Sequence, residues 1–287
     1  MALQIGCSRA PKKAKGADEH QATLSKLDAY TSGCLDQAER IFAIGDRYRA
    51  RFGATPPATP GDLVVAGSPD PEGCVAQIER VKDEAPSLPE LEAAAAAYGR
   101  AMTAVFTATK ARDHAALIAA FRDFDTAHGV LFDQVYRLNH DLRRQQLARR
   151  QDDEGRTYGV IADDLMIRGE GLVRFGAIRW DRVDAIDVAA MNAELAQFER
   201  TLDELAEYVG DGADKAEPRM DRFPEISTYA KAYLVAAKQL ASRASGKIPF
   251  SDAEKIMIAA DNEIAVVGAP APMITAYNNL VTAYIRP

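Results

Sequence analysis

The chain has 287 residues, of which 47% are hydrophobic, enough for a sizeable core in one large domain or two ordinary ones. Its formal net charge is -7 and the two signs are interspersed, which argues against a general attraction to nucleic acid or to anionic membranes. The sequence contains no run of about 18 apolar residues, so it predicts no transmembrane helix.

Residues 1–18 are polar and basic and predict a flexible N-terminal tether. Cys7 lies in this segment, directly after the small residue Gly6, as a cysteine does at a bacterial lipid-attachment site. Gln4 stands where that motif has an apolar residue, and the charged and apolar regions of a signal peptide are missing. Two interpretations stay open: a truncated start with a lipidated Cys7, or an ordinary thiol.

A first helical half is expected over residues 19–150. From Glu19 to Phe52, apolar residues recur in alternating steps of four and three, which predicts one long helix packed along other helices. Cys34 lies on that apolar face. The proline-rich stretch 53–73 predicts an irregular connection, and Cys74 opens a short helical run.

The most regular stretch of the chain runs from Leu117 to Leu142. Its apolar positions keep the same alternating spacing past His128, which we interpret as a core histidine. Asp113 is expected to cap this helix after a brief turn at 110–112; alternatively, the helix runs on from the preceding one. The preceding helix is expected to begin with a capping box formed by Ser87 and Glu90.

Residues 151–155 break the pattern and mark a candidate boundary, followed by a second helical half over 156–287. Helical periodicity returns repeatedly in that half, and no hairpin signal appears. The segments are 158–178, which we expect to be disturbed by its glycines, then 183–209, 226–240, 251–260 and 273–285. The predicted fold class is therefore all-α, an elongated bundle of long antiparallel helices whose two halves form one continuous domain.

Three short segments together are similar to landmarks of a known family. They are Lys26-Leu27-Asp28-Ala29-Tyr30 with the following Cys34, Ser87-Leu88-Pro89-Glu90-Leu91 with Tyr98, and Tyr277-Asn278-Asn279-Leu280-Val281. The chain resembles, over residues 24–285, the YiiG-like bacterial envelope lipoproteins, whose shared region is a domain of unknown function. Asp28 departs from that family's asparagine. The resemblance implies an export signal, a lipid-attached cysteine and an envelope location, and it carries over no reaction and no catalytic residues.

The location implied by the resemblance suggests a role for each of the three cysteines. In an oxidising compartment, Cys34 and Cys74 would form a disulfide and leave Cys7 for the lipid. Such a bridge would pin the proline-rich connection to the bundle. The alternative, two buried free thiols in a cytosolic protein, stays open.

The sequence offers no metal or cofactor site by spacing. The four histidines lie outside any H-x-x-E or H-E-x-x-H pattern; they are His20, His114, His128 and His140. Asp163 and Asp164, or the acidic run 152–154, could pair for acid–base chemistry. The favoured interpretation is that these carboxylates are solvated at the surface or cap helices. The Gly-rich and nucleophile-elbow motifs are also absent.

Four tyrosines lie on two helices close to the C-terminus, namely Tyr229, Tyr233, Tyr277 and Tyr284. They could line a groove for a glycan or a peptide. Aromatic residues at helical spacing are more often core residues with a polar tip at the surface, which is the competing interpretation.

We therefore expect a non-enzymatic protein without a cofactor, tethered by Cys7 to a membrane of the bacterial envelope and facing the periplasm. Its helical bundle would bind an unknown envelope protein or ligand, and no nucleic acid. One alternative is a helical enzyme with a site of carboxylates and tyrosines between the two halves. Another is a cytosolic scaffold that dimerises through an exposed heptad seam.

Overall fold

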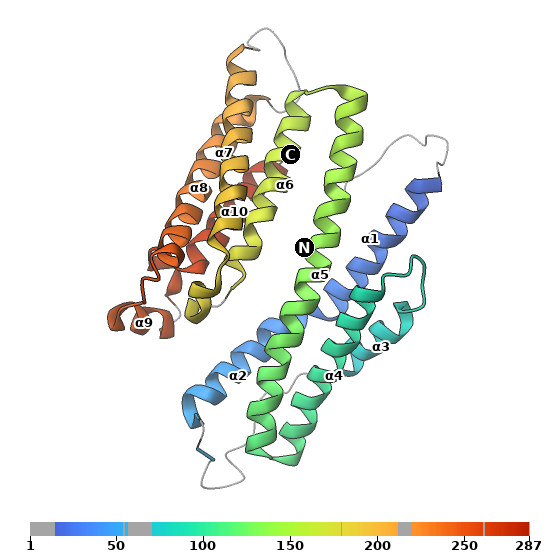
Figure 1. Cartoon of the computed structure of the whole chain (residues 1–287), viewed down its shortest axis with the longest axis vertical. Coiled ribbons are helices and arrows are strands. Elements are labelled where there is room, and N and C mark those ends of the chain that lie inside the picture. The colour runs from blue at the N-terminus through green and yellow to red at the C-terminus, as the bar shows by residue number, and fades with distance from the viewer. Residues whose placement is uncertain are drawn as a thin grey trace. The chain divides into compact units, whose positions relative to one another are not determined.

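The computed structural model describes residues 15–53, 55–56, 71–178, 180–211, 220–260 and 262–286. Within these ranges every regular element is a helix, so the predicted all-α fold class is confirmed (Figure 1). None of the helices in this part of the chain has the length and hydropathy needed to span a bilayer. The chain divides into two compact units, Met1–Asn139 and His140–Pro287.

In the residues that the structure describes, unit 1 contains four helices, a 3-10 turn and the first part of a fifth helix. In chain order these are α1 (Lys15–Gly33), η1 (Leu35–Gln37), α2 (Ala38–Phe52), α3 (Pro71–Val81), α4 (Pro89–Ala111) and α5 (His114–Glu154). Helix α5 is 41 residues long and contains the whole of the regular stretch 117–142, as its apolar spacing predicts.

The prediction of a single long helix from Glu19 to Phe52 is wrong, because the chain turns at Cys34. The backbone there leaves the helical region, with φ -128° and ψ -59°. Gly33, just before it, lets α3 approach closely, since an added Cβ would lie 2.7 Å from Cγ of Gln77. Cys34 and Cys74 are fully buried and form a disulfide, as expected from the sequence.

Helix α4 ends at Ala111; the next residue, Arg112, has a left-handed φ of 55°, and α5 starts at His114. The Asp113 carboxylate accepts a hydrogen bond of 3.0 Å from the backbone N–H of Ala116, which confirms the expected cap. The prediction of a capping box formed by Ser87 and Glu90 is wrong. The helix begins only at Pro89, so Leu88 is the N-cap, and no side chain caps it.

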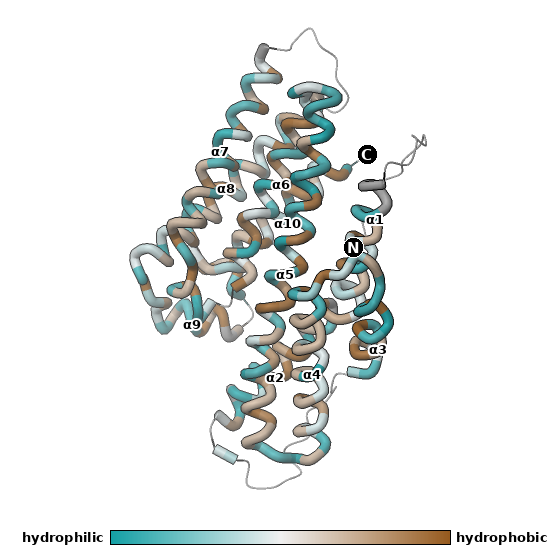
Figure 2. Tube along the Cα trace, turned by 45° about the vertical axis from the view of Figure 1, so that its right-hand side comes forward, coloured by the Kyte–Doolittle hydropathy of each residue, from teal (hydrophilic) through white to brown (hydrophobic). Residues whose placement is uncertain are grey.

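Unit 2 contains the end of α5 and a four-helix bundle with shorter helical segments. In chain order these are α6 (Tyr158–Gly176), η3 (Trp180–Ala185), α7 (Val188–Asp211), η4 (Met220–Arg222), α8 (Phe223–Ser245), α9 (Asp252–Ala259), η5 (Glu263–Ala265) and α10 (Pro270–Ile285). The bundle closes because α6 packs on α7, α7 on α8, α8 on α10 and α10 on α6. Hydrophilic and hydrophobic stretches alternate along these helices (Figure 2), as expected of amphipathic helices around a core.

The expectation that glycines disturb 158–178 is wrong, because α6 is continuous to Gly176. Gly169 serves close packing: a Cβ there would lie 3.3 Å from the rings of both Phe198 and Tyr277. The glycine therefore admits two aromatic rings against the helix and does not end it.

The boundary proposed at residues 151–155 coincides with the end of α5 and the turn at Gly155, which has φ 76°. The two units themselves divide inside α5, between Asn139 and His140. The last part of α5 belongs to unit 2 because Leu147 packs with Val160 and Ile167 of α6 in a small buried cluster.

Candidate functional site

The four tyrosines proposed to line a groove have different environments. Tyr233 is fully buried, and its hydroxyl donates a 2.9 Å hydrogen bond to the backbone carbonyl of Gly169. Its ring lies edge-on to Phe198 and 5.4 Å from the ring of Tyr277. Burial raises the pKa of Tyr277. Tyr233 and Tyr277 are thus brought together as part of the core of unit 2.

Tyr229 and Tyr284 lie elsewhere on the same helices. Tyr229 is half-buried and packs against the rim of the core. Tyr284, on α10, donates a hydrogen bond to the Asp163 carboxylate of α6. The structure therefore places Tyr284 in a charged cluster and not beside Tyr233.

Asp163 and Asp164 are neighbours in sequence but point to different partners. Asp163 pairs with Arg150 of α5, whereas Asp164 pairs with Arg156. Successive residues of a helix with 3.6 residues per turn project in directions about 100° apart, so the two carboxylates face different neighbouring elements. They do not form the acid–base pair considered from the sequence.

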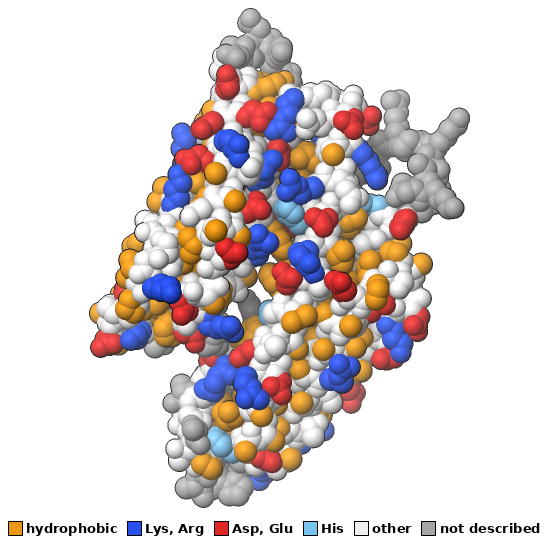
Figure 3. Space-filling view, in the orientation of Figure 1, with side chains coloured by type: hydrophobic (Ala, Val, Ile, Leu, Met, Phe, Trp, Pro, Cys, Tyr) orange, Lys and Arg blue, Asp and Glu red, His pale blue; other side chains and the backbone are white. Residues whose placement is uncertain are grey.

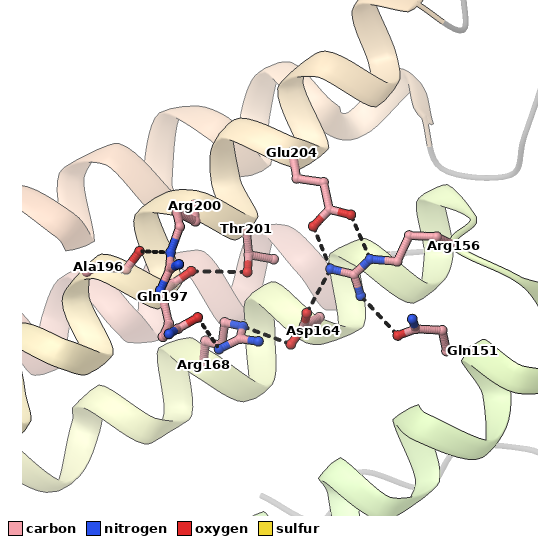
Figure 4. Close-up of polar contacts among 9 residues, drawn as sticks. All are labelled: Gln151, Arg156, Asp164, Arg168, Ala196, Gln197, Arg200, Thr201 and Glu204. Carbon is pink, nitrogen blue, oxygen red and sulfur yellow. Dashed lines mark hydrogen bonds and ion pairs between the residues drawn. The ribbon is translucent and has the colours of Figure 1, made fainter.

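Charged side chains of both signs are interspersed over the face of the molecule in Figure 3. Several of them form ion pairs between helices. The most extensive network surrounds Asp164, which is 7% exposed (Figure 4). Its two oxygens lie 2.9 Å from Nη2 of Arg156 and 2.9 Å from Nε of Arg168.

Arg156 connects three segments of unit 2. Its Nε and Nη2 lie 2.6 Å and 2.5 Å from the two oxygens of Glu204 on α7, a two-point pairing (Figure 4). Nη1 donates a longer bond of 3.4 Å to Gln151 at the end of α5. Hydrogen bonding to Glu204 raises the pKa of Arg156 above its usual range. The network ties α5, α6 and α7 together, and paired arginine–carboxylate contacts of this kind stabilise packing.

A second polar cluster joins the end of α5 to α6. Arg143 pairs with Glu170, and Arg150 pairs with Asp163 and, at 3.1 Å, with Glu154. Each of these three carboxylates is thereby matched by an arginine. The cluster is typical of an ion-paired helix contact.

A cavity of about 330 Å³ lies in unit 2 near the end of α8 and the start of α9. Trp180, the only tryptophan of the chain, stands in its wall with its ring edge-on to Phe250, at 5.7 Å and 89°. The lining residues are Trp180, Asp181, Val183, Asp184, Arg243, Lys247, Ile248, Pro249, Phe250 and Lys255. The sequence did not predict this site, because its residues come from four segments. The single tryptophan is a signal that could have indicated it.

Arg243 forms part of one wall of this cavity. Its guanidinium lies 4.2 Å from the ring centroid of Phe250, 2.5 Å from Oε1 of Glu254 and 2.9 Å from the carbonyl oxygen of Val267. Glu254 also closes a capping box with Ser251 at the start of α9. Arg243 and Ser251 together lower the pKa of Glu254 to about 2. The α9 segment is therefore fixed to α8 by a charged contact beside the cavity.

A smaller hollow of about 260 Å³ lies between α3 and α4 in unit 1. Its lining is apolar around Val75, Ile78 and Gly99, with Glu79 and Arg100 at the edge. It offers fewer polar groups for recognition than the Trp180 cavity does.

Lys26 occupies a buried polar site in unit 1 and is only 1% exposed. Its ammonium donates to the carbonyl oxygens of Lys82, Glu84 and Pro86, at 3.2, 2.8 and 3.1 Å, and lies 2.5 Å from Oε1 of Glu92. A buried lysine with this many acceptors is fully paired, and it joins α1 to the connection between α3 and α4.

Within the described residues, no group of three or more His, Cys, Asp or Glu side chains is arranged to hold a metal ion. His128 lies among aromatic rings, 4.8 Å from that of Phe42 and 5.9 Å from that of Phe132. Burial lowers the pKa of His128 to about 4. His114 contacts the Tyr48 hydroxyl at 2.8 Å. Cys7 and most of the expected tether lie outside the described residues.

A family model described as "Protein of unknown function (DUF3829)" matches residues 107–286. The chain belongs to the DUF3829 family. No curated protein and no solved structure matches the chain.

The DUF3829 match includes the end of α4, the whole of α5 and every helix that the structure describes in unit 2. The Asp164 network and the Trp180 cavity therefore lie inside the family region. Lys26 and the Cys34–Cys74 disulfide lie outside it and belong to the preceding helices of this chain.

Proposed function

We propose that the protein is a lipid-anchored protein of the bacterial cell envelope that binds a partner or ligand and catalyses no reaction. The observation that carries this proposal is the disulfide between Cys34 and Cys74. Disulfides persist in oxidising compartments such as the periplasm and are rare in the cytosol, where thiols are kept reduced. The bridge therefore favours a location outside the cytoplasm.

The position of the disulfide supports a structural role. It joins the turn between α1 and α2 to helix α3, and the two cysteines are 40 residues apart in sequence. In the chain-entropy model, closing a loop of that length stabilises the folded state by roughly 3–4 kcal/mol. A small helical unit held in this way suits a protein exposed to the conditions outside the cytoplasm.

The lipid anchor is proposed on the sequence alone. Gly6 followed by Cys7, a polar segment between that cysteine and α1, and the resemblance to the YiiG-like envelope lipoproteins support it. Lipidation of Cys7 would leave the other two cysteines as a matched pair.

The polar groups of unit 2 support binding over catalysis. Asp163 and Asp164, the carboxylates best placed in sequence for acid–base work, diverge and are each paired with arginine. The Trp180 cavity, by contrast, has the size and the mixed apolar and charged lining of a site for a small ligand.

The test is intact mass spectrometry of the protein produced from its full genomic reading frame in a bacterium with an envelope. We expect loss of the residues before Cys7, a diacylglyceryl-sized addition on that cysteine, and a link between Cys34 and Cys74 that reductant opens. The matched variant Cys7→Ser should lose the lipid and keep the link. An unprocessed chain with three free thiols would overturn the proposal and favour a cytosolic scaffold instead.

A further inference from the structure

The rim of the Trp180 cavity carries opposite charges on different elements. Asp181 and Asp184 come from η3, whereas Lys247 follows α8 and Lys255 belongs to α9. Lys255 also lies 3.2 Å from Asp252, but both side chains are largely exposed, so this pair contributes little. A ligand in the cavity therefore meets carboxylates from one segment and ammonium groups from another.

The interior of the cavity is apolar. Phe250 and Val183 are 7% and 5% exposed, and Trp180 is half-buried with its ring against Phe250. Ile248, by contrast, is 53% exposed at the edge of the cavity. A bound molecule with an apolar side chain would cover the exposed parts of Ile248 and Trp180 and gain the free energy of their removal from water.

The positive charge of Arg243 is already matched. Its guanidinium is held by Glu254, by the carbonyl oxygen of Val267 and by the ring of Phe250. Arg243 therefore shapes the wall. Both rim lysines are exposed, but Lys255 lies 3.2 Å from Asp252, so we assign Lys247 to a ligand anion.

We propose that this cavity binds short zwitterionic peptides. The peptide's ammonium group would lie beside Asp184, its carboxylate beside Lys247, and an apolar side chain against Trp180 and Phe250. The volume of about 330 Å³ is at the small end of ligand cavities, which suits a dipeptide.

The mixed rim argues against ligands of a single charge. An anion without an amino group is repelled by Asp184, and a cation without a carboxylate is repelled by Lys247 and Lys255. A wholly apolar molecule leaves the rim charges poorly solvated. A molecule that carries both charges satisfies both sides.

This inference names the ligand class for the binding role proposed above and rests on that role. Its test needs neither export nor lipidation. A protein that is lipidated and disulfide-bonded but does not bind the probe would keep the proposed location and remove only this inference.

The experiment uses the fluorescence of the full chain, in which Trp180 is the only tryptophan, so its emission reports on this cavity. The probe is the dipeptide Leu-Leu, compared with N-acetyl-Leu-Leu, which lacks the ammonium group, and with Leu-Leu amide, which lacks the carboxylate. We expect a saturable change in emission with Leu-Leu and an affinity roughly tenfold weaker for each blocked form.

Two substitutions assign the charges. Asp184→Asn should weaken Leu-Leu binding and, because it removes a repulsive charge, should strengthen N-acetyl-Leu-Leu binding. Lys247→Gln should likewise weaken Leu-Leu binding and strengthen Leu-Leu amide binding. Asp203→Asn on α7 and Lys231→Gln on α8 change the same charges at exposed positions outside the cavity and serve as controls. Thermal unfolding of each variant, followed by circular dichroism, separates loss of binding from loss of the fold.

Three results would overturn the inference. They are no saturable change in Trp180 emission with Leu-Leu, equal affinity for the free and the blocked dipeptides, and binding that neither Asp184→Asn nor Lys247→Gln alters. Equal affinity would mean that the cavity takes apolar molecules without regard to their charge.

Discussion

Lys26 and Glu92 form an ion pair in unit 1, with Nζ 2.5 Å from Oε1, although the two residues are 66 positions apart in sequence. The lysine is buried, and the backbone N–H of Leu88 donates a 3.0 Å bond to the same carboxylate oxygen. One carboxylate thereby fixes both the lysine of α1 and the first turn of α4. Together these two hydrogen bonds lower the pKa of Glu92.

Replacing Lys26 by Met should destabilise the protein by about 3 kcal/mol, because Glu92 and three carbonyl oxygens lose a buried donor. Urea unfolding at neutral pH measures this change. Lys82→Met removes an exposed lysine paired with Glu79 and should have little effect. Equal effects of the two substitutions would show that the buried pair does not stabilise unit 1.

His128 should make stability depend on pH. Its pKa in the folded protein is about 4, below the ordinary value of 6.5, because burial disfavours the charged ring. The unfolded chain therefore binds the proton first. The stability that the folded protein gains from the neutral ring of His128 is fully present above pH 6.5 and is lost as the pH falls to about 4. The total loss in the free energy of unfolding is about 3 kcal/mol.

The substitution His128→Leu should remove this part of the pH dependence. The measurement is the difference in unfolding free energy between pH 7.5 and pH 4.5, for the wild type and for the variant, from urea titrations. The wild type should lose more stability over that interval than the variant does. Identical losses would mean that the ring titrates normally in the folded protein.

Glycines 169 and 129 should respond in opposite ways to alanine. A Cβ at Gly169 meets the rings of Phe198 and Tyr277 at 3.3 Å, whereas nothing lies within 4 Å of a Cβ at Gly129 in α5. Gly129→Ala should therefore stabilise the helix by up to about 1 kcal/mol. Gly169→Ala should not stabilise the protein in this way, because the new Cβ would crowd the two aromatic rings. Gly169→Val should destabilise unit 2 by about 1–3 kcal/mol. Thermal unfolding of the three variants decides; a stabilised Gly169→Val protein would contradict the packing.

The Asp164 network predicts an asymmetry between its members. Arg156→Met leaves Asp164, which is 7% exposed, with Arg168 alone and also frees Glu204, whereas Glu204→Gln leaves the Arg156–Asp164 pair intact. Because Arg156 is partly exposed, solvent screening limits the loss for Arg156→Met to about 1–2 kcal/mol. Glu204→Gln should cost less. Urea unfolding compares the two, and a larger loss for Glu204→Gln would contradict the arrangement in Figure 4.

Patterns of residues close together in the sequence correctly predicted the features that belong to a single helix. The apolar spacing from Leu117 to Leu142 predicted α5, and the position of Asp113 predicted its cap, because periodicity and capping are properties of one helix. The same logic failed at Cys34. The turn there depends on α3 packing against Gly33, a contact between distant segments that spacing in one helix does not encode.

The two Ser-x-x-Glu patterns of the chain show the limit of motif reasoning. Ser251 and Glu254 form a capping box, whereas Ser87 and Glu90 do not, because Pro89 starts α4 one residue too late. The pattern alone does not distinguish them. The Trp180 cavity was not predictable for a related reason: its charges become neighbours only when η3, α8 and α9 meet.

We propose that this DUF3829 protein works outside the cytoplasm with a disulfide between Cys34 and Cys74. The most direct measurement starts with acid quenching of bacterial cells that express the full reading frame, followed by alkylation of free thiols under denaturing conditions, because both cysteines are buried in the folded protein. Reduction and a second, heavier alkylating label follow. The account predicts that Cys34 and Cys74 carry only the second label. Finding the first label on both cysteines would contradict it, because the disulfide would then be absent where the protein resides.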